Sequence, residues 1–214
     1  SLAGSSAGLL TAVTLPKAAF AADEAPQKWD QTVDLLVVGA GGAGLASAVS
    51  AAQHGVKNIV VLEKMPFFGG NTSISGGGFN SVDPVRQGKQ KIKDSPELHA
   101  RQTLAGGDGR ANPELVKTMT ANSYDAIKWL QDMGMKFKDD VYQIYGGLYP
   151  RCHAPYGSLG SDYIKVLKPQ CDKEGINILT NSRVVRIFRE NQLSGKVLGV
   201  EYVDKDGQHK TVKA

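Results

Sequence analysis

The feature that most constrains the fold of this chain is a glycine motif at residues 37–44, Val-Val-Gly-Ala-Gly-Gly-Ala-Gly. An apolar run at 35–38 leads into it, and a segment rich in alanine and serine follows at 43–54. A second apolar run, 58–62, is followed directly by Glu63, which lies 19 positions beyond the last glycine of the motif. A bare G-x-G-x-x-G pattern is weak evidence, but strand, tight turn, helix, strand and acid in this order predict a dinucleotide-binding βαβ unit.

Each residue of the motif has a mechanical reason in such a unit. Gly39 permits the sharp turn, Gly41 lets the backbone approach a diphosphate, and Gly44 lets the helix pack on the sheet. The unpaired N–H groups of the helix start, at the positive end of its dipole, face the phosphates. The carboxylate of Glu63 can accept hydrogen bonds from the ribose hydroxyls. The alternative is an ordinary strand–helix turn whose glycines serve packing alone.

A second glycine-rich segment follows the acid at residues 67–78. Its composition predicts neither helix nor strand, but a loop that brings backbone donors against a flat or charged ligand. Two helix starts follow, each with a capping residue before a proline, at Ser95 and Asn112. We expect the second helix to stop at Gly134 and its apolar residues to be core; these are Leu115, Val116, Met119, Ile127, Trp129, Leu130 and Met133.

The last third of the chain predicts one helix and then four strands. The helix covers 161–174, and the strands cover 177–180, 182–189, 197–204 and 208–212. Lys205-Asp206-Gly207 between the last two strands is a hairpin signal.

Composition excludes some functions and leaves others open. The chain has 214 residues, 41% of them hydrophobic, and a net charge of +4. Its basic residues are scattered, and the densest cluster, Lys89, Lys91 and Lys93, is expected on a solvated loop face, so no nucleic-acid partner is expected. Cys152 and Cys171 have no metal-ligand spacing; they either form a disulfide or remain two buried thiols. We expect no metal site.

The first 22 residues differ in character from the rest. Residues 1–21 contain no acid and one lysine, have a mildly apolar centre, and end in Ala19-Phe20-Ala21. This pattern predicts an export signal that is too short to anchor in a bilayer; a frayed terminus is the alternative. Its weak hydrophobicity favours a twin-arginine signal and a periplasmic location. Residues 23–32 are expected to be a polar linker, and 33–214 one domain.

These motifs, in this order, resemble the FAD-binding domain of the fumarate reductase/succinate dehydrogenase flavoprotein family. The soluble periplasmic flavocytochrome c-type branch is the most similar, because the Arg151-Cys152-His153-Ala154-Pro155 segment also matches it. The resemblance covers 33–214 and implies an α/β, Rossmann-like domain of the glutathione-reductase type, with a βαβ start and a late antiparallel hairpin. Family members continue with a capping domain that carries the catalytic residues, so this resemblance implies an FAD domain that is incomplete at its C-terminus.

The resemblance also implies the cofactor and its contacts. Membrane-bound members carry a histidine that bonds covalently to the flavin where this chain has Asn71, which implies noncovalent FAD. The expected cofactor-binding residues are Gly39, Ala40, Gly41, Gly44, Glu63, Lys64, Gly70, Asn71, Thr72, Gly77, Gly78 and Val184. Ala40 and Gly41 are expected under the diphosphate, and the backbone of Val184 is expected at the adenine.

The activity implied is reduction of the activated C=C bond of a small carboxylate of the fumarate, urocanate or methacrylate type. A multihaem c-type cytochrome is the implied electron donor. An NAD(P)-linked Rossmann dehydrogenase and a non-catalytic flavin-binding electron-relay module remain alternatives, with a ketosteroid dehydrogenase or aspartate oxidase less favoured. His153 is either catalytic, a residue that orients the flavin loop, or a surface residue. His54 is expected to cap a helix end, and His99 and His209 to lie on the surface.

Overall fold

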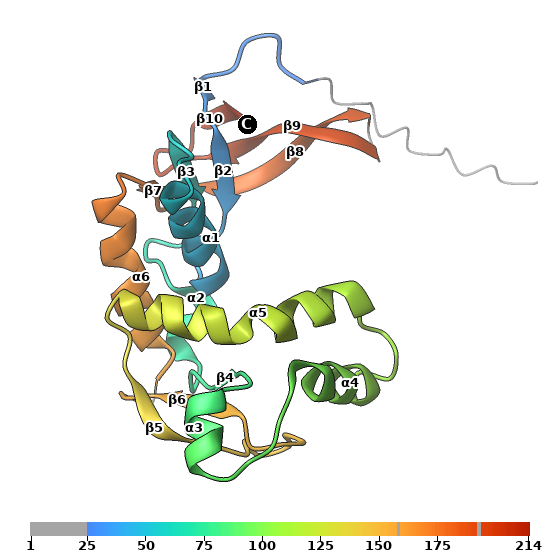
Figure 1. Ribbon diagram of the computed structural model, residues 1–214. Helices are drawn as coiled ribbons and strands as arrows, with labels where there is room; N and C mark the ends of the chain where they lie inside the picture. Colours follow the sequence, from blue (N-terminus) through green and yellow to red (C-terminus); the bar gives the residue numbers. More distant parts are fainter. Residues whose placement is uncertain (1–24, 158, 192–193) are drawn as a thin grey trace, which may run out of the picture.

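The computed structural model describes residues 25–157, 159–191 and 194–214. The strands of this part of the chain form three sheets, which follow one another from top to bottom in Figure 1. The expected α/β class, with a βαβ start and a late antiparallel hairpin, is confirmed. The expected export signal, residues 1–22, lies outside the described residues.

The middle sheet contains the βαβ unit. Strand β2 (Leu35–Val38) leads into helix α1 (Gly42–Gln53), and β3 (Ile59–Leu62) returns parallel to β2. Strand β7 (Asn177–Leu179) pairs in parallel with the other side of β3, so the order is β2-β3-β7. Because parallel neighbours need a crossover connection, α1 packs across the sheet and places its N-terminus at the end of β2.

Strand β3 is buried on both of its faces. Ile59 and Val61 pack in the cluster formed with α1 and with α6 (Ser161–Lys173). Val60 and Leu62 belong to a second cluster, which includes residues of the four-stranded sheet. Side chains alternate along a strand, so a strand covered on both faces must be apolar throughout, as Ile-Val-Val-Leu is.

The four-stranded sheet has the order β1-β10-β9-β8. Its members are β1 (Gln31–Thr32), β8 (Arg183–Asn191), β9 (Ser194–Val203) and β10 (His209–Lys213). The predicted hairpin joins β9 and β10, which pair in antiparallel register. Strand β1 pairs in parallel with β10, and the N–H of Thr211 donates to Asp30 at 2.8 Å. The polar segment expected as a linker therefore already belongs to the sheet at its last residues.

The third sheet was not predicted from the sequence. It consists of β4 (Phe79–Asn80), β6 (Cys152–Pro155) and β5 (Phe137–Tyr142), in the order β4-β6-β5. Helix α3 (Pro84–Lys89) lies beside it in Figure 1. Strands of two to six residues carry too little periodicity to be recognised, and the pairing of β4 with β6 joins segments more than seventy residues apart.

Helices α4 (Pro96–Gly106) and α5 (Pro113–Asp132) begin at the predicted caps. Ser95 Oγ accepts from the N–H of Leu98 at 3.1 Å, and Asn112 Oδ1 accepts from that of Glu114 at 2.9 Å. The N-terminal half of α5 packs mainly on α4, so part of its apolar surface stays uncovered.

Not every residue expected in the core of α5 is buried. Leu115 and Met119 are 68% and 50% exposed, so their assignment to the core was wrong. Val116, Ile127 and Leu130 are buried as expected, and Trp129 and Met133 pack partly buried against the main cluster.

Three further expectations can be compared with the structure. His54 follows α1, and its Nδ1 lies 2.7 Å from the carbonyl oxygen of Ser50, consistent with the expected capping role. His99 is only 5% exposed, so its placement on the surface was wrong, whereas His209 is exposed. Cys152 and Cys171 are two free, buried thiols.

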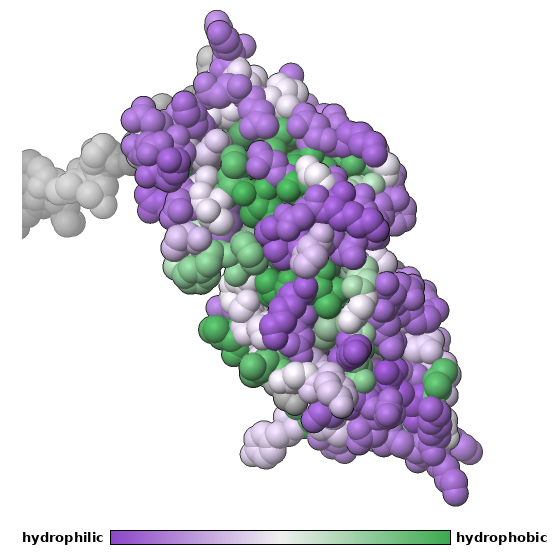
Figure 2. Space-filling view, turned by 90° about the vertical axis from the view of Figure 1, so that its left-hand side faces the viewer, coloured by the Kyte–Doolittle hydropathy of each residue, from purple (hydrophilic) through white to green (hydrophobic). Residues whose placement is uncertain are grey.

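The surface of the face that carries α6 is mixed in character. Figure 2 shows hydrophobic residues there in separate patches among hydrophilic ones. No helix within the described residues is both long enough and apolar enough to cross a membrane.

Candidate functional site

The glycine motif forms the turn between β2 and α1. Gly39 has φ +99°, a left-handed conformation that favours glycine, and its N–H donates to the carbonyl of Leu62 in β3 at 2.8 Å. Gly41 is the N-cap of α1 and has extended backbone. The amides of the first turn of α1 lack carbonyl partners four residues back, so this end of the helix favours an anion.

The packing expected of Gly44 is present in the structure. A Cβ on Gly44 would lie 1.9 Å from the carbonyl oxygen of Gly39 and 3.3 Å from a methyl carbon of Val37. A Cβ on Gly41 would meet only the carbonyl oxygen of Gly69, at 3.8 Å. The turn is therefore tightly packed toward the sheet at Gly44 and open at Gly41, the position expected to face a diphosphate.

Glu63 is buried at the end of β3, next to the turn. Its Oε2 accepts from the N–H of Ala40 at 2.8 Å, and its Oε1 accepts from the N–H of Met65 at 2.8 Å. Each carboxylate oxygen retains a further lone pair, so Glu63 can still accept from ribose hydroxyls. The neighbouring Lys64 is exposed.

Ala40 differs from the other residues of the turn. It is fully buried, and its N–H is already bonded to Glu63. In this conformation Ala40 holds the acid in place and offers no free amide to a ligand. Its expected contact with the diphosphate stays a prediction, and that contact requires the bond to Glu63 to open.

The second glycine-rich segment lies directly against this turn. The N–H of Gly69 donates to the carbonyl of Ala40 at 2.7 Å, and the N–H of Gly42 donates to Thr72 Oγ1 at 3.1 Å. Residues Gly70–Ile74 form a short helix, α2, where the sequence predicted an irregular loop. This prediction was wrong because the glycines with positive φ, Gly69 and Gly70, lie at the start of the segment, and residues 71–74 that follow them contain no glycine. Asn71 and Gly70 are exposed, and Thr72 is half-buried.

Gly77 and Gly78 connect α2 to β4. Gly77 is buried with φ +71°, and a Cβ there would lie 2.8 Å from the backbone nitrogen of Gly160. Tyr163 Oη donates to the carbonyl of Gly77 at 2.7 Å, and burial raises the pKa of this phenol beyond its usual range. Gly78 is exposed on one side, while on the other a Cβ would meet Cys152 Sγ at 2.7 Å.

A cavity of about 370 Å³ lies between these segments. The turn and the second segment contribute Gly42, Ala43, Thr72, Ser75, Gly77 and Gly78, and α5 and α6 contribute an apolar wall. The structure thus brings three of the predicted residues, Thr72, Gly77 and Gly78, to one cavity beside the start of α1.

The segment that precedes Val184 is hydrogen-bonded through its backbone to the segment around Glu63. The N–H of Ser182 donates to the carbonyl of Glu63 at 2.8 Å, and the N–H of Asn181 donates to that of Met65 at 3.0 Å. These bonds fix the start of β8 beside the acid, two residues before Val184. Val184 itself is paired with Tyr202 of β9 and partly buried, and its contact with adenine stays a prediction.

Behind β4 lies a buried polar network that sequence reasoning missed. Arg151 and Asp94 form a bidentate pair, with Nε–Oδ2 at 2.9 Å and Nη2–Oδ1 at 2.7 Å. His153 is fully buried, and its Nε2 lies 3.0 Å from Asp83 Oδ2. Its interpretation as a surface residue was therefore wrong. The Asp83-Pro84 dipeptide, a helix-start signal like those at Ser95 and Asn112, could have revealed α3.

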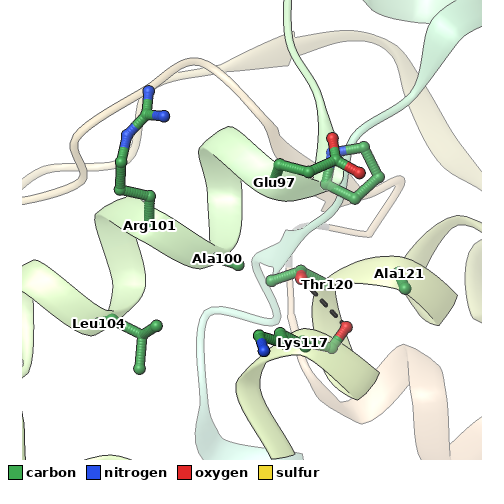
Figure 3. A pocket seen from close by; sticks show the side chains of 8 residues that line it. Glu97, Ala100, Arg101, Leu104, Lys117, Thr120 and Ala121 are labelled. Atoms are coloured by element: carbon green, nitrogen blue, oxygen red, sulfur yellow. Dashed lines mark hydrogen bonds between the residues drawn. The ribbon is translucent and has the colours of Figure 1, made fainter. Parts of the chain in front are cut away.

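Other cavities lie away from the turn. A groove of about 510 Å³ separates α4 from α5, and Figure 3 shows the side chains that line it, among them Arg101 and Leu104 from α4 and Lys117 from α5. None of the predicted cofactor-binding residues lines this groove. Across the described part of the chain, no group of three or more His, Cys, Asp or Glu residues could hold a metal ion.

A glycine turn at a βα junction, with a buried acid at the end of the next strand, defines a dinucleotide-binding protein of Rossmann type. The chain matches the family described as FAD binding domain over residues 34–214, and it belongs to that family. FAD is therefore the cofactor of this domain, rather than the NAD(P) of the alternative dehydrogenase.

Named relatives agree with this assignment. The chain is 36% identical over 171 residues to the fumarate reductase (cytochrome) of Shewanella frigidimarina, covering 79% of this chain and 29% of that protein. It is 30% identical to the acrylate reductase flavoprotein subunit of Shewanella woodyi, covering 98% of this chain and 42% of that one. A solved open conformation of a flavocytochrome c3 fumarate reductase superposes with TM-score 0.79 at 31% identity, over 87% of this chain and 33% of that chain. The chain thus spans less than half the length of these relatives.

The residues present fit an FAD. The turn is open where a diphosphate must approach Gly41, and Glu63 keeps acceptor capacity. The amide of Gly42 is bonded to Thr72 Oγ1, whereas the next amides of the first turn of α1 have no carbonyl four residues back to bond. The role of each residue in binding the cofactor is taken up as a proposal below.

Proposed function

We propose that this chain is the FAD-binding part of a reductase that acts on the activated C=C bond of a small unsaturated carboxylate. Fumarate, urocanate and methacrylate are the substrate types considered, and relatives named as fumarate and acrylate reductases support the class. The observation that carries the proposal is the joint arrangement of the βα turn, the buried Glu63 and the second glycine segment docked on that turn.

We assign the binding roles as follows. Gly41 and the amides that follow Gly42 in the first turn of α1 hold the diphosphate, because their N–H groups lie at the positive end of the helix and the N–H of Gly42 is bonded to Thr72. Glu63 accepts from the ribose, with Lys64 at its border, and the backbone near Val184 meets the adenine. Asn71, Thr72, Gly77 and Gly78 line the path to the ring system. Asn71 has no nucleophilic nitrogen, so FAD is held without a covalent bond.

The bound FAD supplies hydride to the substrate. The chain's own contribution is to bind and orient the cofactor through backbone donors and one carboxylate, and the catalytic acid is not assigned to any residue of this chain.

The setting of the enzyme is also proposed. Residues 1–22 are an export signal of the twin-arginine type, 23–32 begin the mature chain, and the protein acts in the periplasm. A multihaem c-type cytochrome delivers the electrons, consistent with the relative named fumarate reductase (cytochrome).

A non-catalytic flavin-binding electron-relay module, the alternative considered from the sequence, is the second candidate. One experiment separates the two. The purified chain is titrated with FAD. The intact native protein that contains this chain is then reduced with a viologen dye and exposed separately to fumarate, urocanate and methacrylate, because the acid that completes the reaction is not assigned to this chain. Reoxidation by one of these supports the reductase; binding and reduction without reoxidation support the relay. If the chain binds no FAD, both candidates are wrong.

A further inference from the structure

His153 occupies a specific place behind the second glycine segment. It lies on β6 opposite Phe79 of β4, the residue that follows Gly78, and its side chain is fully buried. Its Nδ1 lies 3.1 Å from the carbonyl oxygen of Phe79 and 3.2 Å from that of Arg151. Its Nε2 lies 3.0 Å from Asp83 Oδ2.

All of these partners accept hydrogen bonds. The carbonyl oxygens can only accept, so Nδ1 must donate to them. Burial raises the pKa of Asp83, but hydrogen bonds from Arg86, His153 and Val85 outweigh it and leave that pKa below its ordinary value. Asp83 is therefore an ionised carboxylate, and it lies against Nε2 on the other side of the ring.

The charges around the ring complete this arrangement. Asp83 Oδ1 accepts from the N–H groups of Val85 and Arg86 at 2.8 and 2.9 Å, and Oδ2 accepts from Arg86 Nη1 at 2.9 Å. The second cation on β6, Arg151, is paired with Asp94. The edge of the imidazole meets the Phe137 ring, with centroids 5.9 Å apart.

The two ion pairs are joined into one network. Gln87 is buried between them: its Oε1 accepts from the N–H of Asp83 at 2.8 Å, and its Nε2 donates to Asp94 Oδ2 at 2.9 Å. The carbonyl of Arg151, which faces His153 Nδ1, also accepts from the N–H of Ser81 at 3.0 Å. The network therefore ties α3 and β6 to the segment that runs out of Gly77 and Gly78.

We propose that His153, whose buried imidazole bridges the Phe79 carbonyl to Asp83, is the positioning residue for the Gly77–Gly78 segment of the FAD site. This inference rests on the proposed function, in which that segment lines the cofactor. Removal of the imidazole breaks the link to Phe79 and the link to Asp83. Release of Phe79 loosens β4 next to Gly78; release of Asp83 frees β6 from α3.

The first test compares His153→Gln with His209→Gln in the full chain. His209 is exposed, so its variant is a matched loss of a histidine away from the segment. We expect His153→Gln to raise the FAD dissociation constant about tenfold, the usual effect of losing one charge-assisted hydrogen bond, and to change the visible circular dichroism of bound FAD. We expect His209→Gln to leave both unchanged. Equal FAD affinity in His153→Gln and wild type would overturn the positioning role, while the proposed function would stand.

The second test needs neither a variant nor FAD. In the wild-type chain labelled with ¹⁵N-histidine, long-range ¹H–¹⁵N spectra should show hydrogen on Nδ1 of His153, the nitrogen that faces the carbonyl oxygens of Phe79 and Arg151. A bare Nδ1 would overturn the proposal, even if His153→Gln failed to fold. Absence of FAD binding by the wild-type chain, with hydrogen on Nδ1, would instead refute the proposed function.

Discussion

The substitution Gly44→Ala tests the packing of α1 on the turn that precedes it. The added Cβ would lie 1.9 Å from the carbonyl oxygen of Gly39, a backbone atom that no side-chain rotation can move away. Relief requires α1 and the turn to separate by roughly 1 Å or more, since nonbonded carbon contacts are near 3.5 Å. Overpacking of this kind costs about 1–3 kcal/mol.

The helix itself favours the substitution. Alanine stabilises a helix interior by about 0.5–1 kcal/mol relative to glycine, which offsets part of the cost. Because the carbonyl oxygen of Gly39 can move only with the backbone, we place the cost at the top of this range and expect a net loss of about 2 kcal/mol in the free energy of unfolding. For a chain of this size that corresponds to a fall in Tm of about 4–8 °C.

Urea unfolding followed by circular dichroism measures this change, and Gly88→Ala is the matched control. Gly88 also lies in a helix, α3, but a Cβ there meets nothing within 4 Å. We expect Gly88→Ala to be neutral or slightly stabilising and Gly44→Ala to be destabilised with weaker FAD binding. Equal stability of the two variants would refute the packing argument.

Glu63→Gln replaces an acceptor with a donor beside the Ala40 amide, so we expect the affinity for FAD to fall about tenfold. Flavin fluorescence measures this affinity, and an unchanged value would show that Glu63 does not bind the cofactor. Burial raises the pKa of Asp83 and of Asp94, but hydrogen bonds outweigh it and leave both below the ordinary value. The contribution of these two carboxylates to the free energy of unfolding is therefore fully present above pH ~4 and is lost as the pH falls through their lowered pKa values. The free energy of unfolding, measured in urea, should therefore fall less between about pH 5 and pH 2 in Asp94→Asn than in the wild type. Burial raises the pKa of the Cys171 thiol to about 11; native protein at pH 8 should react slowly with a disulfide reagent and denatured protein quickly, whereas fast native reaction would mean that α6 opens.

Local chemistry in the sequence determined the βαβ unit and the helix starts. A turn at Gly39 and caps at Ser95 and Asn112 depend on residues within a few positions of one another, so their patterns can be read directly. The same holds for the hairpin between β9 and β10. The family resemblance extended this to FAD, and the match over residues 34–214 agrees.

Tertiary structure alone decided what lies behind the glycine segments. The network of Asp83, Gln87, Asp94, Arg151 and His153 joins residues up to 70 positions apart, and none of its links follows from spacing. The burial of Ala40 and the exposure of Leu115 could not be predicted from the sequence either, because burial depends on which distant element packs against a residue. Short-range hydrogen bonding is encoded along the chain, whereas burial and ion pairing arise only when its segments meet.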